Sequence, residues 1–239
     1  MIALDVEQGS PVWLQARCGS VTSSRVADVL AKRKDGKEAA ARRDLRYELV
    51  CEQLTGRISD NYVSQYMKDG IEREPLARAE YELRNGVYVE QVGFVCHPTI
   101  KLAGCSPDGL VGADGLIEIK CPKPETHLGY LLSGEIPADY LPQIRWQLAC
   151  TGCEWCDFVS YHPDLPDACQ LFVKRLLRDK ENAAIIRGME LEVEHFLAQV
   201  AEMVEQLGGV PERENCQQAT VPASDSELIT DADMPESWR

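Results

Sequence analysis

Three charged residues, Asp108, Glu118 and Lys120, stand close together in a part of the chain that is otherwise apolar. Side chains alternate along a β-strand, so Glu118 and Lys120 would project from one face about 6–7 Å apart. The apolar residues between and beside them would project from the other face and be buried. Asp108 lies on the preceding strand of the same hairpin. The pattern therefore predicts two carboxylates with an adjacent ammonium group.

This combination is suited to metal-assisted hydrolysis of a phosphodiester. Mg²⁺ prefers carboxylate oxygens and water as ligands. A bound metal lowers the pKa of its water, and a metal pair clamps the attacking and leaving oxygens. Lys120 would position or deprotonate that water, or offset charge on phosphorus. The ordinary alternative is a surface hairpin with a solvated Glu/Lys pair. Asp108, ten residues before Glu118, and the apolar alternation favour the catalytic interpretation.

The elements that must position these residues follow from the periodicity. Helices are expected after Thr22-Ser23-Ser24 and over residues 38–54, 72–84, 125–133, 139–151 and 179–207, with Pro75 in the first turn of the third. Strands are expected over residues 87–96, 102–111, 116–121, 155–161 and 170–176. This order of helices and strands predicts an α/β fold with a central mixed sheet flanked by helices.

Composition divides the chain into two parts. Residues 1–210 read as one domain, and residues 211–239 carry seven acids and two bases with few large apolar residues, which is typical of a flexible acidic tail. The whole chain has a net charge of −14. A field of that sign repels polyanions at long range and argues against nucleic-acid binding. The local residues argue the opposite.

Longer motifs carry a family resemblance. Cys105-Ser106-Pro107-Asp108-Gly109-Leu110 and the segment from Gly115 to Pro122 resemble the PD-(D/E)xK nucleases, in particular their lambda exonuclease branch, the YqaJ-type viral recombinase family. Further matches lie in the right order at residues 17–24, 70–78 and 143–147, so the resemblance covers about residues 10–205. It implies a restriction-endonuclease-like α/β core.

The resemblance also implies roles for single residues at the catalytic centre. Asp108 and Glu118 would bind Mg²⁺, with Mn²⁺ as a substitute, and Glu74 and the Ile119 carbonyl would complete the ligand set. Lys120 would orient or activate water. For Glu74, the alternative is a favourable interaction with the dipole at the start of its helix.

Other matching positions would contact DNA. Arg17 with Ser23 and Ser24 would hold a 5′-phosphate, for which a helix N-terminus and a guanidinium fork are both suited. Gln143 and Gln147 share one helical face and would contact DNA near the active centre. Met67 matches the place of an apolar wedge between strands. The alternatives are a Ser/Thr helix cap, a solvated helix face and a core methionine, respectively.

The function that the resemblance implies is a 5′→3′ exonuclease on linear double-stranded DNA with a 5′-phosphate. It would release mononucleotides and leave a 3′ overhang for recombination, without a nucleotide cofactor. A homotrimeric ring and a single-strand annealing recombinase are the implied assembly and partner, and the source would be a phage or prophage. The alternatives are a related endonuclease and a non-catalytic acidic DNA mimic or inhibitor, which the net charge favours.

Two further signals are weighed. Cys150, Cys153 and Cys156 have a spacing seen in zinc and iron–sulfur sites, but no fourth cysteine has a matching spacing, so three ordinary thiols are expected. Residues 31–46 carry seven bases and three acids and are the best candidate for a strip that tracks DNA, the alternative being a solvated helix and loop.

Neither a secretory signal nor a membrane span is found in the sequence. The first residues lack a basic region followed by a long apolar run, and no apolar run approaches the roughly 18 residues that a membrane helix needs. We therefore expect a location in the cytoplasm of a bacterial host.

Overall fold

A computed structural model describes residues 1–58 and 65–209, and it has mixed β-sheets flanked by helices. The helices are α1 (Pro11–Arg17), α2 (Val26–Leu30), α3 (Ala40–Thr55), α4 (Gln65–Asn85), α5 (Pro124–Ser133), α6 (Leu141–Thr151) and α7 (Lys180–Gln206), with short 3₁₀ helices η1 (Ala138–Tyr140) and η2 (Asp167–Cys169). The strands are β1 (Ile2–Leu4), β2 (Val21–Thr22), β3 (Val89–Glu90), β4 (Phe94–Cys96), β5 (Ala103–Cys105), β6 (Gly109–Val111), β7 (Gly115–Lys120), β8 (Trp155–Tyr161) and β9 (Leu171–Leu177). The expected tail, residues 211–239, lies outside the described residues.

The strands form two sheets, where the sequence predicted a single central one. Their orders are β1-β4-β5-β2 and β3-β6-β7-β8-β9. Two of the expected strands, residues 87–96 and 102–111, each divide between the sheets. The second division falls at Ser106-Pro107-Asp108, so the bend between the sheets is the place where Asp108 leaves the strand.

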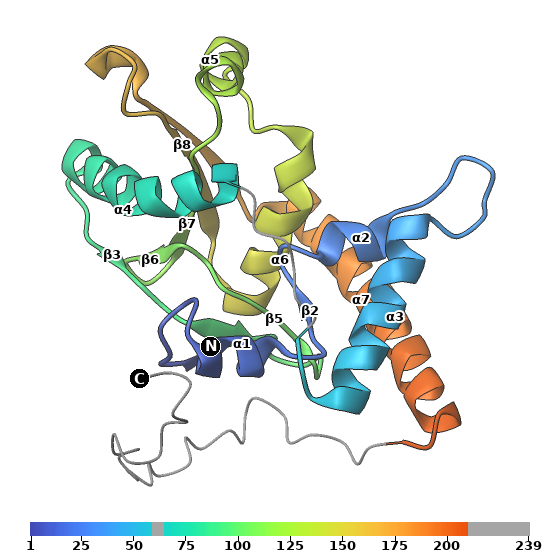
Figure 1. Ribbon diagram of the computed structural model, residues 1–239. Coiled ribbons are helices and arrows are strands. Elements are labelled where there is room, and N and C mark those ends of the chain that lie inside the picture. Colours follow the sequence, from blue (N-terminus) through green and yellow to red (C-terminus); the bar gives the residue numbers. More distant parts are fainter. Residues whose placement is uncertain (59–64, 210–239) are drawn as a thin grey trace, which may run out of the picture.

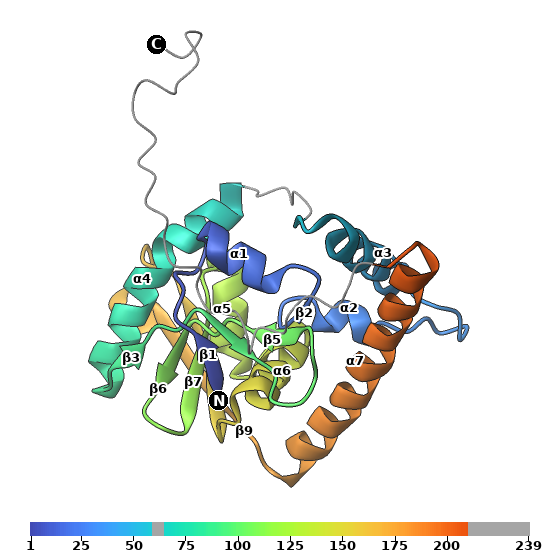
Figure 2. The same cartoon turned by 90° about the horizontal axis from the view of Figure 1, so that it is seen from below.

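Helices cover the five-stranded sheet on both faces. α2, α3, α6 and α7 enclose one apolar cluster that includes Trp146, Phe158 and Val193, while α4 packs Ala77 and Tyr81 against the opposite face. Figure 1 shows α2, α3 and α7 grouped on one side of the molecule and α4 on the other. Figure 2 shows α1 between α4 and α3. Among the described residues, no helix is long and apolar enough to cross a membrane.

The break between β3 and β4, at residues 91–93, depends on a glycine. A Cβ atom on Gly93 would approach the carbonyl oxygens of Val6 and Leu4 far inside van der Waals contact, because the chain after β1 passes directly over this position. We expect Gly93→Ala to lower the free energy of unfolding by more than about 2 kcal/mol. Gly129→Ala, in the open interior of α5, is the control and should be neutral or stabilising by up to about 1 kcal/mol. Chemical denaturation of both variants measures the difference, and equal stability would contradict this packing.

Two helix starts differ from the prediction. α4 begins at Gln65, so Pro75 and Glu74 lie inside the helix, and Glu74 has no helix N-terminus to interact with. Pro75 has no backbone N–H, so α4 lacks one hydrogen bond at this position and still continues through it. α2 has only five residues and its N-cap is Arg25, so the cap role considered for Ser23 and Ser24 is absent. α7, by contrast, starts where expected, with Asp179 accepting a hydrogen bond from the Asn182 backbone N–H.

Candidate active site

Glu118 is the buried centre of the predicted cluster. It lies on β7 with only 1% of its surface exposed, and it forms an ion pair with Lys120 on the same face of the strand. The side-chain amides of Gln143 and Gln147, both on α6, donate hydrogen bonds of 2.6 and 2.5 Å to its two oxygens. A carboxylate has about four lone-pair positions, so these three donors leave one on Oε2 for another partner.

Asp108 lies beside Glu118, as the hairpin pattern predicted. β6 pairs with β7 in a register that opposes Gly109 and Ile117, and the Asp108 Oδ2 atom accepts a 2.6 Å hydrogen bond from the Ile119 backbone N–H. Among the described residues, Oδ1 has no hydrogen-bond donor. Burial raises the pKa of the Asp108 carboxyl well above its usual range, and the nearby charges of Glu118 and Glu74 raise it further. The negative charges of Glu118 and Glu74 therefore disfavour the ionised form of Asp108.

Glu74 reaches the same cluster from α4. Burial raises the pKa of its carboxyl, and the charge of Glu118 adds to that rise, while Arg78 opposes it through a 2.5 Å ion pair. Tyr81, two turns further along the same helical face, donates a 2.8 Å hydrogen bond to buried Asp157 on β8. This second contact fixes α4 on the sheet and so determines where Glu74 lies.

Lys120 is enclosed on its other side by an aromatic ring. Its ammonium lies 5.2 Å from the centre of the Tyr140 ring, which stacks on Phe158. Burial alone would lower the pKa of Lys120, but the charges of Glu118 and Asp108 outweigh that effect and raise it. Lys120 is therefore a fixed cation at neutral pH. Sequence reasoning missed Tyr140, although its position three residues before Gln143 is a usable signal.

The donor set of this cluster fits a hard divalent cation. Carboxylates predominate, and among the described residues one Glu118 lone pair and the Asp108 Oδ1 atom have no protein donor. Burial raises the pKa of Asp108, and the neighbouring carboxylates Glu118 and Glu74 add to that rise. Within residues 1–58 and 65–209, no three His, Cys, Asp or Glu side chains converge as a metal-binding group. A metal ion held here would thus depend on two or three carboxylates supplemented by backbone and water oxygens.

A second polar group surrounds Arg17 at the end of α1. Its guanidinium stacks 3.9 Å above the Trp13 ring, its Nε atom is buried without a hydrogen-bond partner, and burial lowers its pKa to about 10. On the neighbouring turn, Thr22 and Ser24 are linked through their hydroxyls at 3.2 Å; Ser24 is exposed and Ser23 is buried. The expected helix N-terminus contributes little here because α2 is so short.

Trp13 connects the two groups, which the sequence did not predict. Its indole N–H donates a 2.9 Å hydrogen bond to the Ser106 hydroxyl, two residues before Asp108. The Gln8 side-chain amide also donates to the Pro107 carbonyl at 2.9 Å. The segment 8–17 is therefore attached directly to the loop that carries Asp108. A tryptophan four residues before an arginine, on one helical face, was the available signal.

The remaining sequence signals have structural explanations or lie outside the described side chains. Cys150, Cys153 and Cys156 are buried free thiols, and no metal-binding group includes them in the described part of the chain. Met67 belongs to α4, but its side chain is outside the described residues.

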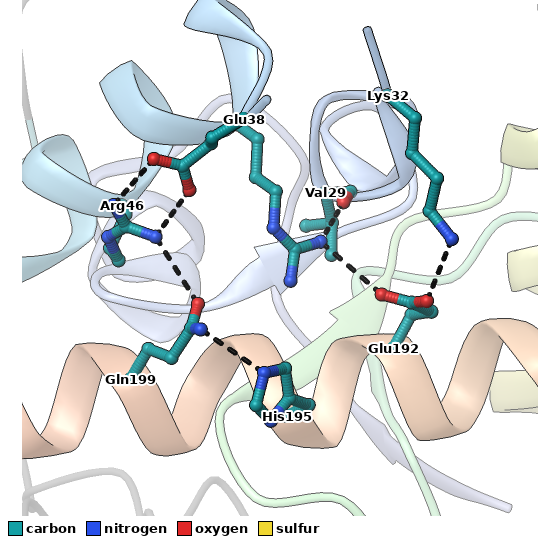
Figure 3. Close-up of polar contacts among 8 residues, drawn as sticks. Val29, Lys32, Glu38, Arg46, Glu192, His195 and Gln199 are labelled. Atoms are coloured by element: carbon teal, nitrogen blue, oxygen red, sulfur yellow. Dashed lines mark hydrogen bonds and ion pairs between the residues drawn. The ribbon is translucent and has the colours of Figure 1, made fainter. Parts of the chain in front are cut away.

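Five of the seven bases in segment 31–46 form ion pairs. Figure 3 shows Lys32 contacting Glu192 of α7 and Arg46 contacting both Glu38 and Gln199. Other ion pairs in the segment are Arg33 with Asp35, Arg43 with Asp44 and Arg42 with Glu192. Most of these charges therefore attach the segment to itself and to α7, which weakens the interpretation as a DNA-tracking strip.

Fold and sequence motifs together place the chain in the PD-(D/E)xK class of nuclease folds. Residues 12–154 match the model of the YqaJ-like viral recombinase domain, which is more than half of the chain, and the chain belongs to that family.

Solved structures and a curated protein show similarity of different extent. The alkaline exonuclease (LHK-Exo) of Laribacter hongkongensis is 45% identical, with a TM-score of 0.76 over 83% of this chain and 96% of that one. Its complex with dAMP matches with a TM-score of 0.75 at the same identity. A phage-related exonuclease of Haemophilus somnus 129PT, 15% identical over 79% of this chain and 96% of that one, shares the fold with a TM-score of 0.56.

An uncharacterised protein of Acanthamoeba polyphaga mimivirus is 27% identical over 181 residues. That match covers 70% of this chain and 31% of the viral protein, so the chain spans about a third of that protein's length.

Proposed function

We propose that this protein is a Mg²⁺-dependent exonuclease that degrades linear double-stranded DNA from 5′-phosphorylated ends, in the 5′→3′ direction. The observation that carries the proposal is the buried Glu118, held between Lys120 and two glutamine amides and adjacent to Asp108. Membership of the YqaJ-like family and 45% identity to an alkaline exonuclease support it. The products would be mononucleotides and a 3′ single-stranded overhang.

In this proposal Asp108 and Glu118 bind the metal, and Glu74 and the Ile119 carbonyl would join the ligand set when it binds. When bound, it supplies activation of water and neutralisation of charge on the phosphate. The residues of the chain then have separate roles. Lys120 presents a fixed positive charge beside the attacked phosphate and orients the water.

Gln143 and Gln147 hold the Glu118 carboxylate in one orientation. Its remaining lone pair is therefore directed before the metal binds, and no side-chain rotamer freedom has to be lost during the reaction. In this structure both amides are directed at Glu118. We therefore propose that they act on DNA chiefly by positioning this carboxylate, in addition to the direct contact that the family resemblance implies.

The 5′-phosphate would bind at Arg17 with Ser23 and Ser24. An arginine whose buried Nε lacks a partner is suited to an anion that accepts from its fork. Through Trp13 and Ser106, this pocket is attached to the Asp108 loop. Occupation of the pocket would thereby place the first phosphodiester at a fixed distance from the catalytic carboxylates. Met67 remains the proposed residue for separating the strands.

The Arg17 pocket leads to a selectivity prediction. Arg17→Ala should slow digestion of 5′-phosphorylated duplex DNA by about 10²-fold, the loss expected for one charge-assisted anion contact. Digestion of the same duplex with 5′-hydroxyl ends should change little. Arg187→Ala, which removes an exposed arginine of α7, is the control and should leave both rates unchanged. Equal slowing on both kinds of ends would refute a role of Arg17 in recognising the phosphate.

Two assembly proposals come from the family resemblance. A homotrimeric ring would retain DNA between successive cuts, and a single-strand annealing recombinase would take up the 3′ overhang. Sedimentation of the full chain with and without duplex DNA tests the first. A monomer under both conditions would exclude the ring.

Two other functions remain to be separated from this one. A related endonuclease would cut covalently closed circular DNA, whereas an exonuclease would leave it intact. The net charge of −14 favours an acidic DNA mimic, which would digest nothing. Incubation of linear and closed circular duplexes with Mg²⁺ or with EDTA distinguishes all three. The proposal expects loss of the linear DNA alone, in Mg²⁺ alone, and cutting of the circles or no digestion would overturn it.

A further inference from the structure

Arg73 is a cation beside the proposed active site, in the part of α4 whose side chains the structure describes. It precedes Glu74 on α4 and is half-buried, and among the described residues it has no carboxylate partner. Eight of the described arginines do have one, whereas Arg17, Arg57, Arg145, Arg178 and Arg187 also lack one. The paired arginines are Arg25, Arg33, Arg42, Arg43, Arg46, Arg78, Arg84 and Arg175. Arg73 differs from the other unpaired arginines in its position, because it directly precedes Glu74 of the carboxylate cluster.

The guanidinium of Arg73 is held in place by a histidine. Its Nη1 atom lies 3.5 Å from Nε2 of His162, which is 4% exposed and whose Nδ1 atom is buried without a hydrogen-bond partner. A neutral imidazole accepts at Nε2, so the contact orients Arg73 without cancelling its charge. An ion pair with an acid would have oriented the guanidinium and also cancelled its charge.

His162 also places this pair near the catalytic strand. β7 and β8 are parallel, with Lys120 opposite Ser160, and His162 follows two residues later at the same ends of the two strands. Arg73 is also the residue directly before Glu74, which extends from α4 to the carboxylate cluster. The guanidinium therefore lies on the α4 side of the active centre.

We infer that Arg73, oriented by His162, binds a backbone phosphate of the DNA next to the active centre. The inference rests on the proposed nuclease function. Three carboxylates at this site repel a polyanion, and an oriented cation on the α4 side offsets that repulsion where the strand must approach. Arginine presents a planar fork that matches two phosphate oxygens. Replacement of an arginine with a purely structural role would instead leave the salt dependence of DNA binding unchanged.

Salt dependence of binding tests this role without catalysis. A fluorescein-labelled, 5′-phosphorylated duplex is titrated with the full chain in EDTA, and anisotropy is followed from about 50 to about 200 mM NaCl. Arg73→Ala should weaken binding about tenfold and reduce the slope of log K against log salt by about 0.9, the value for one lost phosphate contact. Arg73→Lys keeps the charge and should keep the slope.

Arg187→Ala is the matched control, because Arg187 is an exposed arginine of α7. It should bind like the wild type. Thermal unfolding of each variant verifies that the fold is intact. Wild-type binding with an unchanged slope for folded Arg73→Ala would overturn this inference alone. No binding by the wild type at any salt concentration would overturn the proposed function and this inference together.

Discussion

Replacing Lys120 by alanine should reduce the rate of DNA hydrolysis by about 10³-fold while leaving DNA binding in EDTA within a few fold of the wild type. The ammonium is paired with Glu118 and placed over the Tyr140 ring, so it is a fixed charge at the carboxylate cluster. Removal of one preorganised electrostatic group from an active site costs about 10²–10³ in turnover, and loss of a proton-transfer group costs up to about 10⁴. Single-turnover digestion with excess enzyme measures the chemical step.

Lys174→Ala is the control for the lysine prediction. Lys174 lies on β9 and pairs with Glu135 at 3.2 Å, with both side chains largely solvated. Its removal should change neither binding nor rate. If Lys120→Ala and Lys174→Ala digest DNA equally fast, Lys120 has no part in the reaction.

Asp108→Asn should abolish activity and, in EDTA, stabilise the protein by about 1–2 kcal/mol, as is common when a strained functional charge is removed. The carboxylate is surrounded by Glu118 and Glu74, and an asparagine oxygen can still accept the hydrogen bond from the Ile119 N–H. Stability and function are therefore opposed at this residue. Urea denaturation combined with the digestion assay tests both parts.

Asp157→Asn is the control because Asp157 is a buried carboxylate whose charge is compensated. Arg175 donates to both of its oxygens at 2.7 and 2.8 Å, and Tyr81 donates at 2.8 Å. Removal of its charge should lower the free energy of unfolding by about 1–3 kcal/mol. This loss is smaller than that from breaking a fully buried ion pair, because Arg175 is half-exposed. Destabilisation of Asp108→Asn to the same extent would show that Asp108 is a structural carboxylate.

The effect of Asp108→Asn should also depend on pH in a defined direction. The pKa of Asp108 is raised in the folded state, so the folded protein binds this proton more tightly than the unfolded chain does. The wild-type free energy of unfolding therefore falls as the pH rises from the unfolded pKa, about 4, through the folded one. In EDTA, the advantage of Asp108→Asn should be small near pH 4 and grow towards neutral pH. An advantage that shrinks over this range would contradict the raised pKa.

The catalytic strand could be predicted from sequence because it rests on local geometry. Alternation on one strand places Glu118 and Lys120 together, and a short turn returns Asp108 to them, so no long-range information was needed. The packing of Ile117 and Ile119 against α4 is the expected opposite face. The long helix α7 was similarly predictable from its apolar periodicity and its aspartate cap.

Features that depend on tertiary contacts could not be predicted in the same way. The split into two sheets depends on the passage of the chain after β1 over Gly93, far away in sequence. The attachment of the basic segment to α7 requires Glu192 and Gln199, more than 140 residues further along the chain. The contacts of Lys120 with Tyr140 and of Trp13 with Ser106 likewise join distant segments. The start of α4 at Gln65, ten residues before Pro75, likewise departs from the local expectation that proline stands in the first turn of a helix.

The polarity of digestion is the most direct test of the central claim, that this carboxylate–lysine site degrades DNA from 5′ ends. A linear 5′-phosphorylated duplex is labelled on one strand at the 5′ end or at the 3′ end and digested over time by wild type and Lys120→Ala. In Mg²⁺, the wild type should release the 5′ label first as a mononucleotide, while the 3′ label stays on progressively shorter strands. EDTA and Lys120→Ala should leave both labels in place. Earlier release of the 3′ label, or intact DNA with every divalent metal, would contradict the account.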